Sequence, residues 1–166
     1  MKMRMLLLTL FITAITTILN CGSNVATSGS TITVVPTSIT WNSLIPYITN
    51  PIYTTVLSSG GVPMNGIKVT YYASLSVGGF PTATTGYYAF FKNNKVCPSP
   101  CVDTTNSNGM SIMNVLFCST GACSSVVPIP LPYNFSPTTT LTYTDTVYVS
   151  SGTAPIVQIP VKINGQ

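Results

Sequence analysis

The sequence contains no histidine and no glutamate, and only 5% of its 166 residues are charged. An average soluble domain carries about 25% charged residues, so this surface must be formed largely by Ser, Thr, Asn and Tyr. Without histidine, the chain lacks the side chain used most often as a general base or metal ligand. Its only acidic side chains, Asp103 and Asp145, stand in Thr-rich segments where an exposed, solubilising charge is expected. We therefore predict a protein that is not an enzyme and that uses no cofactor or metal.

Basic residues are also too few to form a nucleic-acid surface. Lys2 and Arg4 lie at the extreme N-terminus, and the remaining lysines are scattered at positions 68, 92, 95 and 162. Proteins that bind nucleic acids present a basic stripe that displaces counterions from the phosphates. The sequence therefore argues against nucleic acid as a partner.

Long helical patterns are absent after the first twenty residues. Thr, Val, Ile and Tyr dominate between Gly, Pro and Asn turns, which is typical of β-strands. The alternation is clearest where Ile67, Val69 and Tyr71 share one face of an expected strand. This pattern predicts an all-β fold, a single sandwich of about seven short strands over residues 31–166. We expect strands at 31–35 (ended or bent at Pro36, with Ile39 and Trp41 continuing it), 52–57, 67–73, 87–92, 110–118, 138–149 and 156–163.

The first twenty residues have the features of a cleaved export signal. Lys2 and Arg4 precede an apolar run over residues 5–19, which contains four threonines. That run is short for a permanent span, because crossing the hydrocarbon core takes about 20 apolar residues. A basic start followed by a short apolar segment is instead typical of a signal peptide that is removed. We therefore expect the protein to be exported.

The end of this leader reads Ile18, Leu19, Asn20, Cys21. It resembles the lipoprotein signals of bacteria, in the relaxed form found in spirochaetes, although Leu19 and Asn20 replace the usual small pair. The resemblance implies that residues 1–20 are removed and that Cys21 carries the lipid, so that the protein is anchored in the cell envelope, at the outer membrane. The alternative is plain secretory cleavage near Ala26. Residues 21–30, rich in Gly, Ser and Asn, would form a flexible tether.

Five cysteines are an odd number for an exported chain, but lipid on Cys21 would leave an even set. In an oxidising compartment the other four predict two disulfides. Local pairing would join Cys97 to Cys101 and Cys118 to Cys123, while crossed pairing would close larger loops. The rival interpretation is a zinc site with four thiolates, although three and four intervening residues depart from the usual two. We expect residues 93–103, around the first pair, to form a loop.

Two later segments resemble the bacterial immunoglobulin-like domains of the invasin and intimin type. Residues 61–71, Gly-Val-Pro-Met-Asn-Gly-Ile-Lys-Val-Thr-Tyr, are similar to a family stretch of the form Gly-x-Pro-Val-x-Gly followed by a strand. Residues 104–112, with Asn108 and Gly109, are similar to the family's Asn-Gly turn and following strand. The resemblance implies an immunoglobulin-like β-sandwich. Such domains serve as spacers as well as binders, so adhesion is a weaker implication.

Adjacent aromatic residues suggest a contact surface. Neighbours on a strand point to opposite faces, so one ring of each pair Tyr71-Tyr72 and Tyr87-Tyr88 must point outward. Tyr72 and Tyr88 are the candidates for an exposed aromatic surface that contacts protein or carbohydrate. The alternative is ordinary packing between strands, and Trp41 is expected in the core.

Together these patterns predict a lipid-anchored cell-envelope protein that acts as a non-catalytic binding or structural module, like an adhesin. Its partners would be the membrane, through the N-terminal lipid, and a protein or carbohydrate ligand. The alternative is a secreted filament subunit that associates with itself by lending its N-terminal Thr/Val strand to a neighbour.

Overall fold

Alternating burial defines the strands of this protein, for which we use a computed structural model. In β11 (Val157–Asn164), for example, Ile159, Val161 and Ile163 are buried while the residues between them are exposed. The structure describes residues 25–42, 47–73, 87–93, 95–97, 99–118, 129–130 and 142–164. Its other strands are β1 (Thr31–Val35), β2 (Ile39–Asn42), β3 (Tyr47–Leu57), β4 (Lys68–Ala73), β5 (Tyr87–Lys92), β6 (Lys95–Cys97), β7 (Cys101–Thr104), β8 (Met110–Cys118), β9 (Ile129–Pro130) and β10 (Thr142–Ser150).

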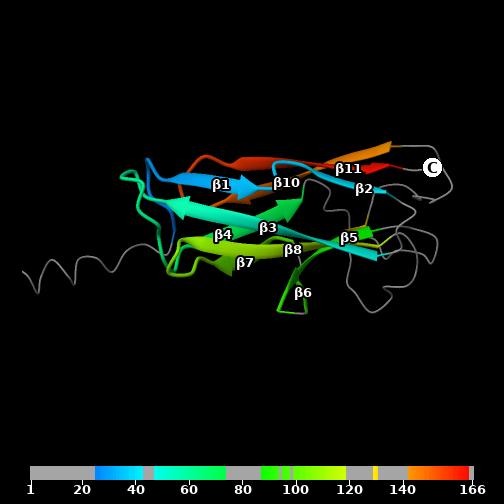
Figure 1. The fold of residues 1–166 in the computed structure, drawn as a ribbon, viewed down its shortest axis with the longest axis horizontal. Coiled ribbons are helices and arrows are strands. Elements are labelled where there is room, and N and C mark those ends of the chain that lie inside the picture. The colour runs from blue at the N-terminus through cyan, green and yellow to red at the C-terminus, as the bar shows by residue number, and fades with distance from the viewer. Residues whose placement is uncertain are drawn as a thin grey trace, which may run out of the picture.

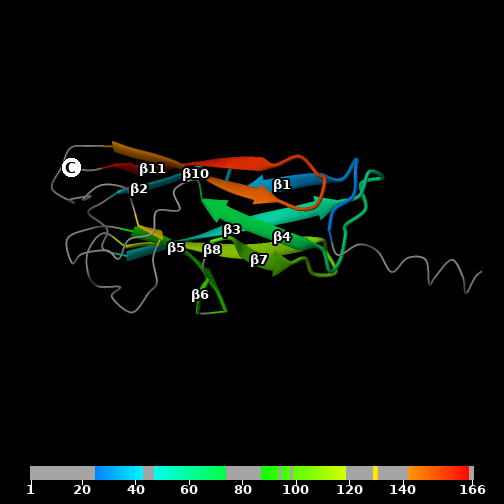
Figure 2. The same ribbon diagram turned by 180° about the vertical axis from the view of Figure 1, so that it is seen from behind.

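These strands form two sheets (Figures 1 and 2). The first has the order β1-β3-β8-β5-β6, with β9 paired to β5, and the second has the order β2-β11-β10-β4-β7. In an immunoglobulin sandwich, strands A, B, E and D form one sheet and strands C, F and G form the other. Here β1, β3, β8 and β5 take the places of A, B, E and D, and β4, β10 and β11 those of C, F and G. The predicted all-β, immunoglobulin-like sandwich is therefore confirmed.

The strand segments number eleven within the described ranges, more than the seven or so expected. One reason lies at Pro36, where the first strand was expected to end or bend and then to continue through Ile39 and Trp41. Instead β1 pairs antiparallel with β3 in the first sheet, whereas β2 pairs parallel with β11 in the second. Proline cannot donate to a ladder, and the chain changes sheets at the Val35–Pro36 bond, which is cis.

A second reason is the segment around the first cysteine pair, which was expected to be a loop. It contains β6, paired with β5 in the first sheet, and β7, paired with β4 in the second. The Pro-rich passage over residues 127–137 is unsuited to a central strand, because proline lacks the N–H that a sheet ladder needs. Its described part, β9, is a short strand beside β5, outside the main path of the sheet.

The core lies between the two sheets. Trp41 is buried, as predicted, and stacks on Phe117 with ring centroids 5.0 Å apart. Tyr71 and Phe90 meet across the same interior at 6.4 Å. Aliphatic residues fill the remaining space: Ile39, Ile52, Val56, Val69, Val115, Val147, Val149, Ile159, Val161 and Ile163.

The chain enters the sandwich through a docked turn. Ala26 is buried, its N–H donates to Ser151 Oγ at 3.1 Å, and its carbonyl accepts from the N–H of Thr153 at 3.1 Å. Ser30, at the end of the same turn, is also buried. The flexible tether predicted for residues 21–30 is therefore wrong from Ala26 onward, because main-chain hydrogen bonds hold this segment to the turn after β10. None of the described segments is a helix that could cross a bilayer.

Candidate functional site: two outer faces and a polar network between the sheets

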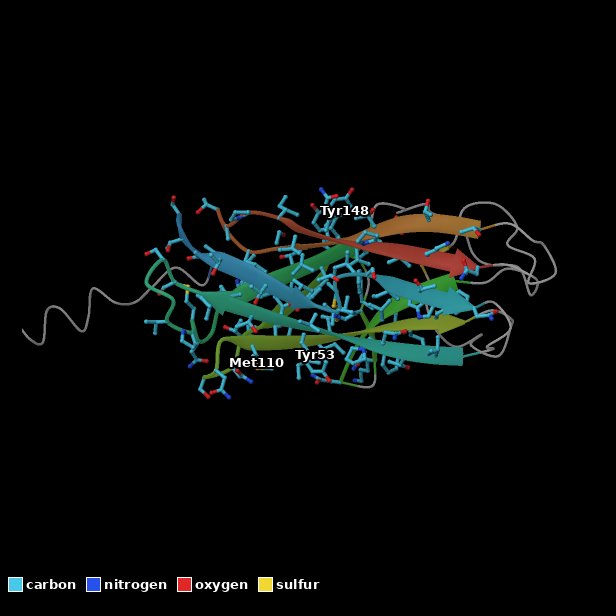
Figure 3. All side chains as sticks on the ribbon, turned by 45° about the horizontal axis from the view of Figure 1, so that its top comes forward. Tyr53, Met110 and Tyr148 are labelled. Atoms are coloured by element: carbon cyan, nitrogen blue, oxygen red, sulfur yellow. A yellow bond between two sulfur atoms is a disulfide. The ribbon has the colours of Figure 1, made fainter. Side chains whose placement is uncertain are left out.

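A pair of stacked tyrosines lies on the outer face of the second sheet. Register places Tyr72 of β4 opposite Tyr148 of β10, and the two rings stack with centroids 4.9 Å apart and an angle of 9° between their planes. Both side chains are half-buried. Tyr148 projects from the upper side of the sandwich in Figure 3. The outward orientation predicted for Tyr72 is thus confirmed, and its ring covers that of a cross-strand neighbour.

The contact surface predicted for Tyr72 and Tyr88 stays a prediction at Tyr88, whose side chain lies outside the described residues. Tyr72 belongs to the second sheet, and Tyr88 lies in β5 of the first. Register sets Tyr88 opposite Phe117 of β8. Tyr148, the true neighbour of Tyr72, was missed because the pairing of β4 with β10 spans a long sequence separation. Only the alternation of Thr144, Thr146 and Tyr148 along one strand could have drawn attention to it.

The outer face of the first sheet carries a more exposed apolar row. Val35 of β1 pairs with Tyr53 of β3, which pairs in turn with Ile112 of β8. Their exposed fractions are 63%, 41% and 45%. Figure 3 shows Tyr53, with Met110 nearby, on the side of the sandwich opposite to Tyr148. We call Val35, Tyr53 and Ile112 the Tyr53 row. A row of exposed apolar side chains on neighbouring strands is typical of an interaction surface.

No charged residue stands in β1, β3 or β8, the three strands that carry the Tyr53 row. Around it lie hydroxyl and thioether groups, since Thr33 pairs with Thr55 and Thr55 with Met110. The face around the Tyr53 row on these three strands is therefore uncharged and made of aromatic, aliphatic, hydroxyl and thioether groups. Such a surface favours uncharged or apolar contacts over acidic or basic ones.

A network of polar side chains joins the two sheets beneath these faces. From the second sheet, Tyr71 places its hydroxyl oxygen 2.8 Å from Thr54 Oγ1 and 2.9 Å from Ser111 Oγ in the first. Ser111 Oγ donates to Asp103 Oδ2 at 2.7 Å, and Asp103 Oδ1 forms an ion pair of 2.7 Å with Lys92 Nζ. Lys92 and Ser111 belong to the first sheet and Asp103 to the second. Buried polar groups satisfied in this way specify one packing of the sheets.

Burial and hydrogen bonding shift the pKa values of two members of the network, Tyr71 and Asp103, in opposite directions. Burial raises the pKa of Tyr71 to about 12, although its hydrogen bonds with Ser111 and Thr54 act in the opposite direction. Partial burial also acts to raise the pKa of Asp103. Hydrogen bonds from Lys92, Ser111 and the backbone of Thr104 outweigh it, and the pKa of Asp103 is held below its ordinary value.

The two aspartates are therefore not the exposed, solubilising charges expected from the sequence. Asp103 is half-buried in the ion pair with Lys92, and Asp145 is buried. Asp145 Oδ1 accepts from the N–H of Thr146 at 2.6 Å. The sequence could not reveal these environments, because both depend on residues brought together by the sheet order.

The arrangement around Ser111 differs from that of a nucleophilic site. Ser111 is 1% exposed, its hydroxyl is directed to Asp103, and the chain has no histidine to act as its base. Within the described ranges, no cluster of three or more His, Cys, Asp or Glu residues is present. The geometry of the network is that of a structural connection between sheets.

One predicted disulfide is present, between Cys97 of β6 and Cys101 of β7. It follows the local pairing scheme and links strands that belong to different sheets. Cys101 is fully buried beside Met113, with the two sulfur atoms 3.7 Å apart. Because the Cys97 and Cys101 sulfurs are bonded to each other, they are not available as the thiolate ligands of a zinc site. Cys118 ends β8, and its side chain, like Cys21 and Cys123, lies outside the described residues.

Comparisons with known proteins give similarities of fold. No family model matches the sequence, and no curated protein matches it. A GH5 xyloglucanase of Bacteroides ovatus is 13% identical with a TM-score of 0.41, over 82% of this chain and 19% of that one. The CupB2 chaperone of Pseudomonas aeruginosa is 10% identical with a TM-score of 0.43, over 80% of this chain and 55% of that one. PapD-like domain 7 of human CEP192 is 12% identical with a TM-score of 0.39, over 89% and 94%.

The chain therefore spans about a fifth of the xyloglucanase and just over half of the chaperone. At such low identities and scores these structures carry no argument about activity, and the resemblance to invasin-type domains stays a prediction. The sheet order is what assigns this chain to the immunoglobulin-like β-sandwich fold. The assignment concerns the fold alone.

Proposed function

We propose that this protein is exported, anchored in the cell envelope by lipid on Cys21, and acts there as a non-catalytic binding module. The leader over residues 1–20 and the cysteine that follows it support the anchor. A triacylated cysteine would supply stable anchoring, because each buried methylene contributes about 0.8 kcal/mol. The outer membrane is the proposed location, by analogy with the lipoprotein signals that the leader resembles.

The single observation that supports binding is the Tyr53 row. Three exposed apolar side chains from three strands face solvent together, on strands that carry no charge. Scattered single hydrophobic residues are ordinary on protein surfaces. A row of them on neighbouring strands in register is instead typical of an interaction surface. Tyrosine at its centre offers a large contact area at a small cost in conformational entropy. We propose this face, rather than the stacked Tyr72 and Tyr148, as the contact surface for a protein or carbohydrate ligand.

The anchor is tested by detergent phase partitioning of cells that express wild type or Cys21→Ala. Wild type should enter the detergent phase, and the variant should stay in the aqueous phase or be secreted. Equal partitioning of the two would overturn the anchor. Protease treatment of intact cells then separates an outward-facing protein, which is cleaved, from a periplasmic one, which is protected.

The contact surface is tested with the double variant Tyr53→Ser/Ile112→Ser on arrayed glycans and extracellular proteins. Binding seen with wild type should fall at least tenfold in this variant. Tyr72→Ser is the matched control, since it removes a tyrosine from the opposite face, and it should bind as wild type does. Retained binding in the double variant, together with loss in Tyr72→Ser, would assign the surface to the second sheet instead.

The filament alternative has one observation in its favour: β1 is the terminal strand of its sheet, and it is uncharged. However, β1 pairs with β3 of its own chain from Thr31 to Val35, so strand exchange would first require those hydrogen bonds to break. Electron microscopy of the native cell surface tests this alternative. Filaments that contain the chain would support it over the monomeric module.

A further inference from the structure

The end of the sandwich where the chain enters is built from four turns. The entry turn over residues 25–30 contacts the turn after β10, through the hydrogen bonds of Ala26 with Ser151 and Thr153. It also contacts the connection after β3, where Ser30 Oγ donates to Met64 Sδ at 3.6 Å. That connection is joined to the turn after β7, because the N–H of Gly66 donates to the carbonyl of Thr105 at 2.9 Å. These turns gather at the left end of the molecule in Figure 1, away from the end of β11.

Three aliphatic side chains are exposed on this turn end. Val62 is 62% exposed, Ile156 53% and Val25 38%. They come from three different turns, and they make up three of the seven large hydrophobic side chains that are exposed in the described part of the chain. The turn end, defined as residues 25–30, 58–67, 105–109 and 150–156, contains no charged residue. The nearest is Lys68, exposed at the start of β4.

The position of Ala26 limits how far this end can lie from Cys21. Only residues 22–24 stand between Cys21 and Val25, the first described residue. Because an extended chain spans at most about 3.5 Å per residue, Val25 lies within about 14 Å of Cys21 whatever the conformation between them. Hydrogen bonds join Ala26 to the turn after β10, and the other turns are joined to one another in the same way. The four turns therefore approach the bilayer together with Val25. A lipid on Cys21 would therefore bring the whole turn end to the bilayer surface.

We propose that the turn end is a second membrane contact, in which Val25, Val62 and Ile156 enter the interfacial region of the lipid bilayer. This inference rests on the proposed lipid on Cys21. Aliphatic side chains gain by leaving water for the boundary between headgroups and acyl chains, and the absence of charge removes the main cost of bringing the turns there. Lys68, at the rim, lies where its ammonium group can reach lipid phosphates.

This contact fixes the orientation of the domain. The strands run away from the turn end, so the sandwich stands on the membrane with β2 and the end of β11 directed away from it (Figures 1 and 2). The Tyr53 row then lies on the side of the standing sandwich, between the two ends. In this orientation the outer faces of both sheets stay clear of the bilayer.

The test is quenching of tryptophan fluorescence by brominated lipid. The full chain and its variants Val62→Trp and Ile156→Trp are purified from membranes and reconstituted in vesicles of phosphatidylcholine, with or without bromine on the acyl chains. Thr40→Trp is the matched control. Thr40 is an exposed threonine that pairs with Lys162, five residues beyond Val157 along β11, or about 16 Å further from the turn end. Trp41 is buried and adds the same background to every sample.

We expect quenching by brominated lipid to be at least twofold stronger for Val62→Trp and Ile156→Trp than for Thr40→Trp. Equal quenching of the three variants, in protein that floats with the vesicles, would overturn the membrane contact and leave the anchor intact. Failure of wild type to float with vesicles would overturn the anchor, and the contact with it. Flotation thus reports the proposed function, and position-dependent quenching reports the further inference.

Discussion

Lys92 of the first sheet and Asp103 of the second form an ion pair of 2.7 Å, at the edge where the disulfide also crosses between the sheets. Lys92 Nζ donates in addition to the carbonyl of Val102 at 3.1 Å. Asp103 accepts a further hydrogen bond from Ser111, so both charged groups have several partners. In a chain with so few charges, this pair fixes how the two sheets meet at one edge.

The ion pair should stabilise the fold at neutral pH and lose this effect in acid. The pKa of Asp103 is lower in the folded protein than its ordinary value of 3.8, so the pair contributes fully above that value. As pH falls through the folded pKa, the carboxylate is protonated and the contribution disappears. We expect Asp103→Asn to lower the free energy of unfolding by about 1 kcal/mol at pH 7, a value that allows for solvent screening of a partly exposed pair.

Urea unfolding of wild type and Asp103→Asn at pH 7 and pH 2.5 measures this effect. The difference between the two proteins should shrink at the lower pH. Lys162→Gln removes an exposed lysine from β11 and serves as a control that should change stability little at either pH. A difference that stays constant from pH 7 to pH 2.5 would contradict the account.

Tyr71→Phe should destabilise the protein, because it removes a buried hydroxyl and leaves Thr54 and Ser111 without that partner. The cost of an unsatisfied buried polar group is about 1–3 kcal/mol. The raised pKa of Tyr71, about 12 against an ordinary 10.0, also has a consequence in alkali. Because the folded state holds Tyr71 in its neutral form, the raised pKa contributes to the free energy of unfolding below pH 10. This contribution is lost as the pH rises through the pKa of the folded protein.

Thermal unfolding between pH 9 and pH 12 therefore separates the two proteins. Wild type should lose stability more steeply than Tyr71→Phe as the pH increases. Tyr72→Phe, which changes the half-exposed neighbour, is the control and should follow wild type. Parallel curves for wild type and Tyr71→Phe would show that the Tyr71 hydroxyl plays no part in alkaline unfolding.

Gly152→Ala should release the entry turn. Gly152 has a φ of +52°, and a Cβ there would clash with the carbonyl oxygen of Ala26, which cannot move without breaking its hydrogen bond from the N–H of Thr153. Gly61→Ala is a matched control, since Gly61 has a φ of +76° with nothing within 4 Å of the added Cβ. Both variants suffer backbone strain of about 1 kcal/mol, but only Gly152→Ala adds a steric clash.

Hydrogen exchange at Ala26 and Thr153 measures this difference. We expect protection at both amides to fall at least tenfold in Gly152→Ala and to stay near the wild-type value in Gly61→Ala. Equal protection in the two variants would mean that the entry turn is not held in the way the structure describes.

The stacked rings of Tyr72 and Tyr148 should be energetically coupled. Aromatic pairs contribute about 0.5–1.5 kcal/mol beyond the area they bury. A double-mutant cycle with Tyr72→Ala, Tyr148→Ala and the double variant should therefore give a coupling energy in this range from urea unfolding. A second cycle with Tyr53→Ala and Tyr72→Ala, which belong to different sheets, should give none. Coupling energies that are the same in both cycles would exclude a specific stacking interaction.

Much of the fold could be predicted because local alternation of apolar residues fixes which face of a strand is buried. Strands 31–35, 87–92 and 110–118 were expected at the bounds that the structure gives, and Trp41 was expected in the core. The change of sheet at Pro36 could not be predicted in the same way. It depends on which distant strand, β3 or β11, supplies the hydrogen bonds on either side of the proline.

The candidate sites were predicted less completely, because each depends on register between strands far apart in sequence. Tyr72 was expected to face outward, but neither its stacking on Tyr148 nor the alignment of Val35, Tyr53 and Ile112 leaves a local signal. The prediction that Asp103 and Asp145 are exposed, solubilising charges was wrong for the same reason. Cys97 and Cys101 are close in sequence, so their pairing could be anticipated as one of the open alternatives.

The decisive measurement is the mass of the intact mature protein, isolated from the producing cell. We expect a chain that begins at Cys21, carries the added mass of acyl groups on that residue, and is two hydrogens lighter for the bond between Cys97 and Cys101. A chain that retains Met1, bears no lipid and has every cysteine reduced would contradict this expectation.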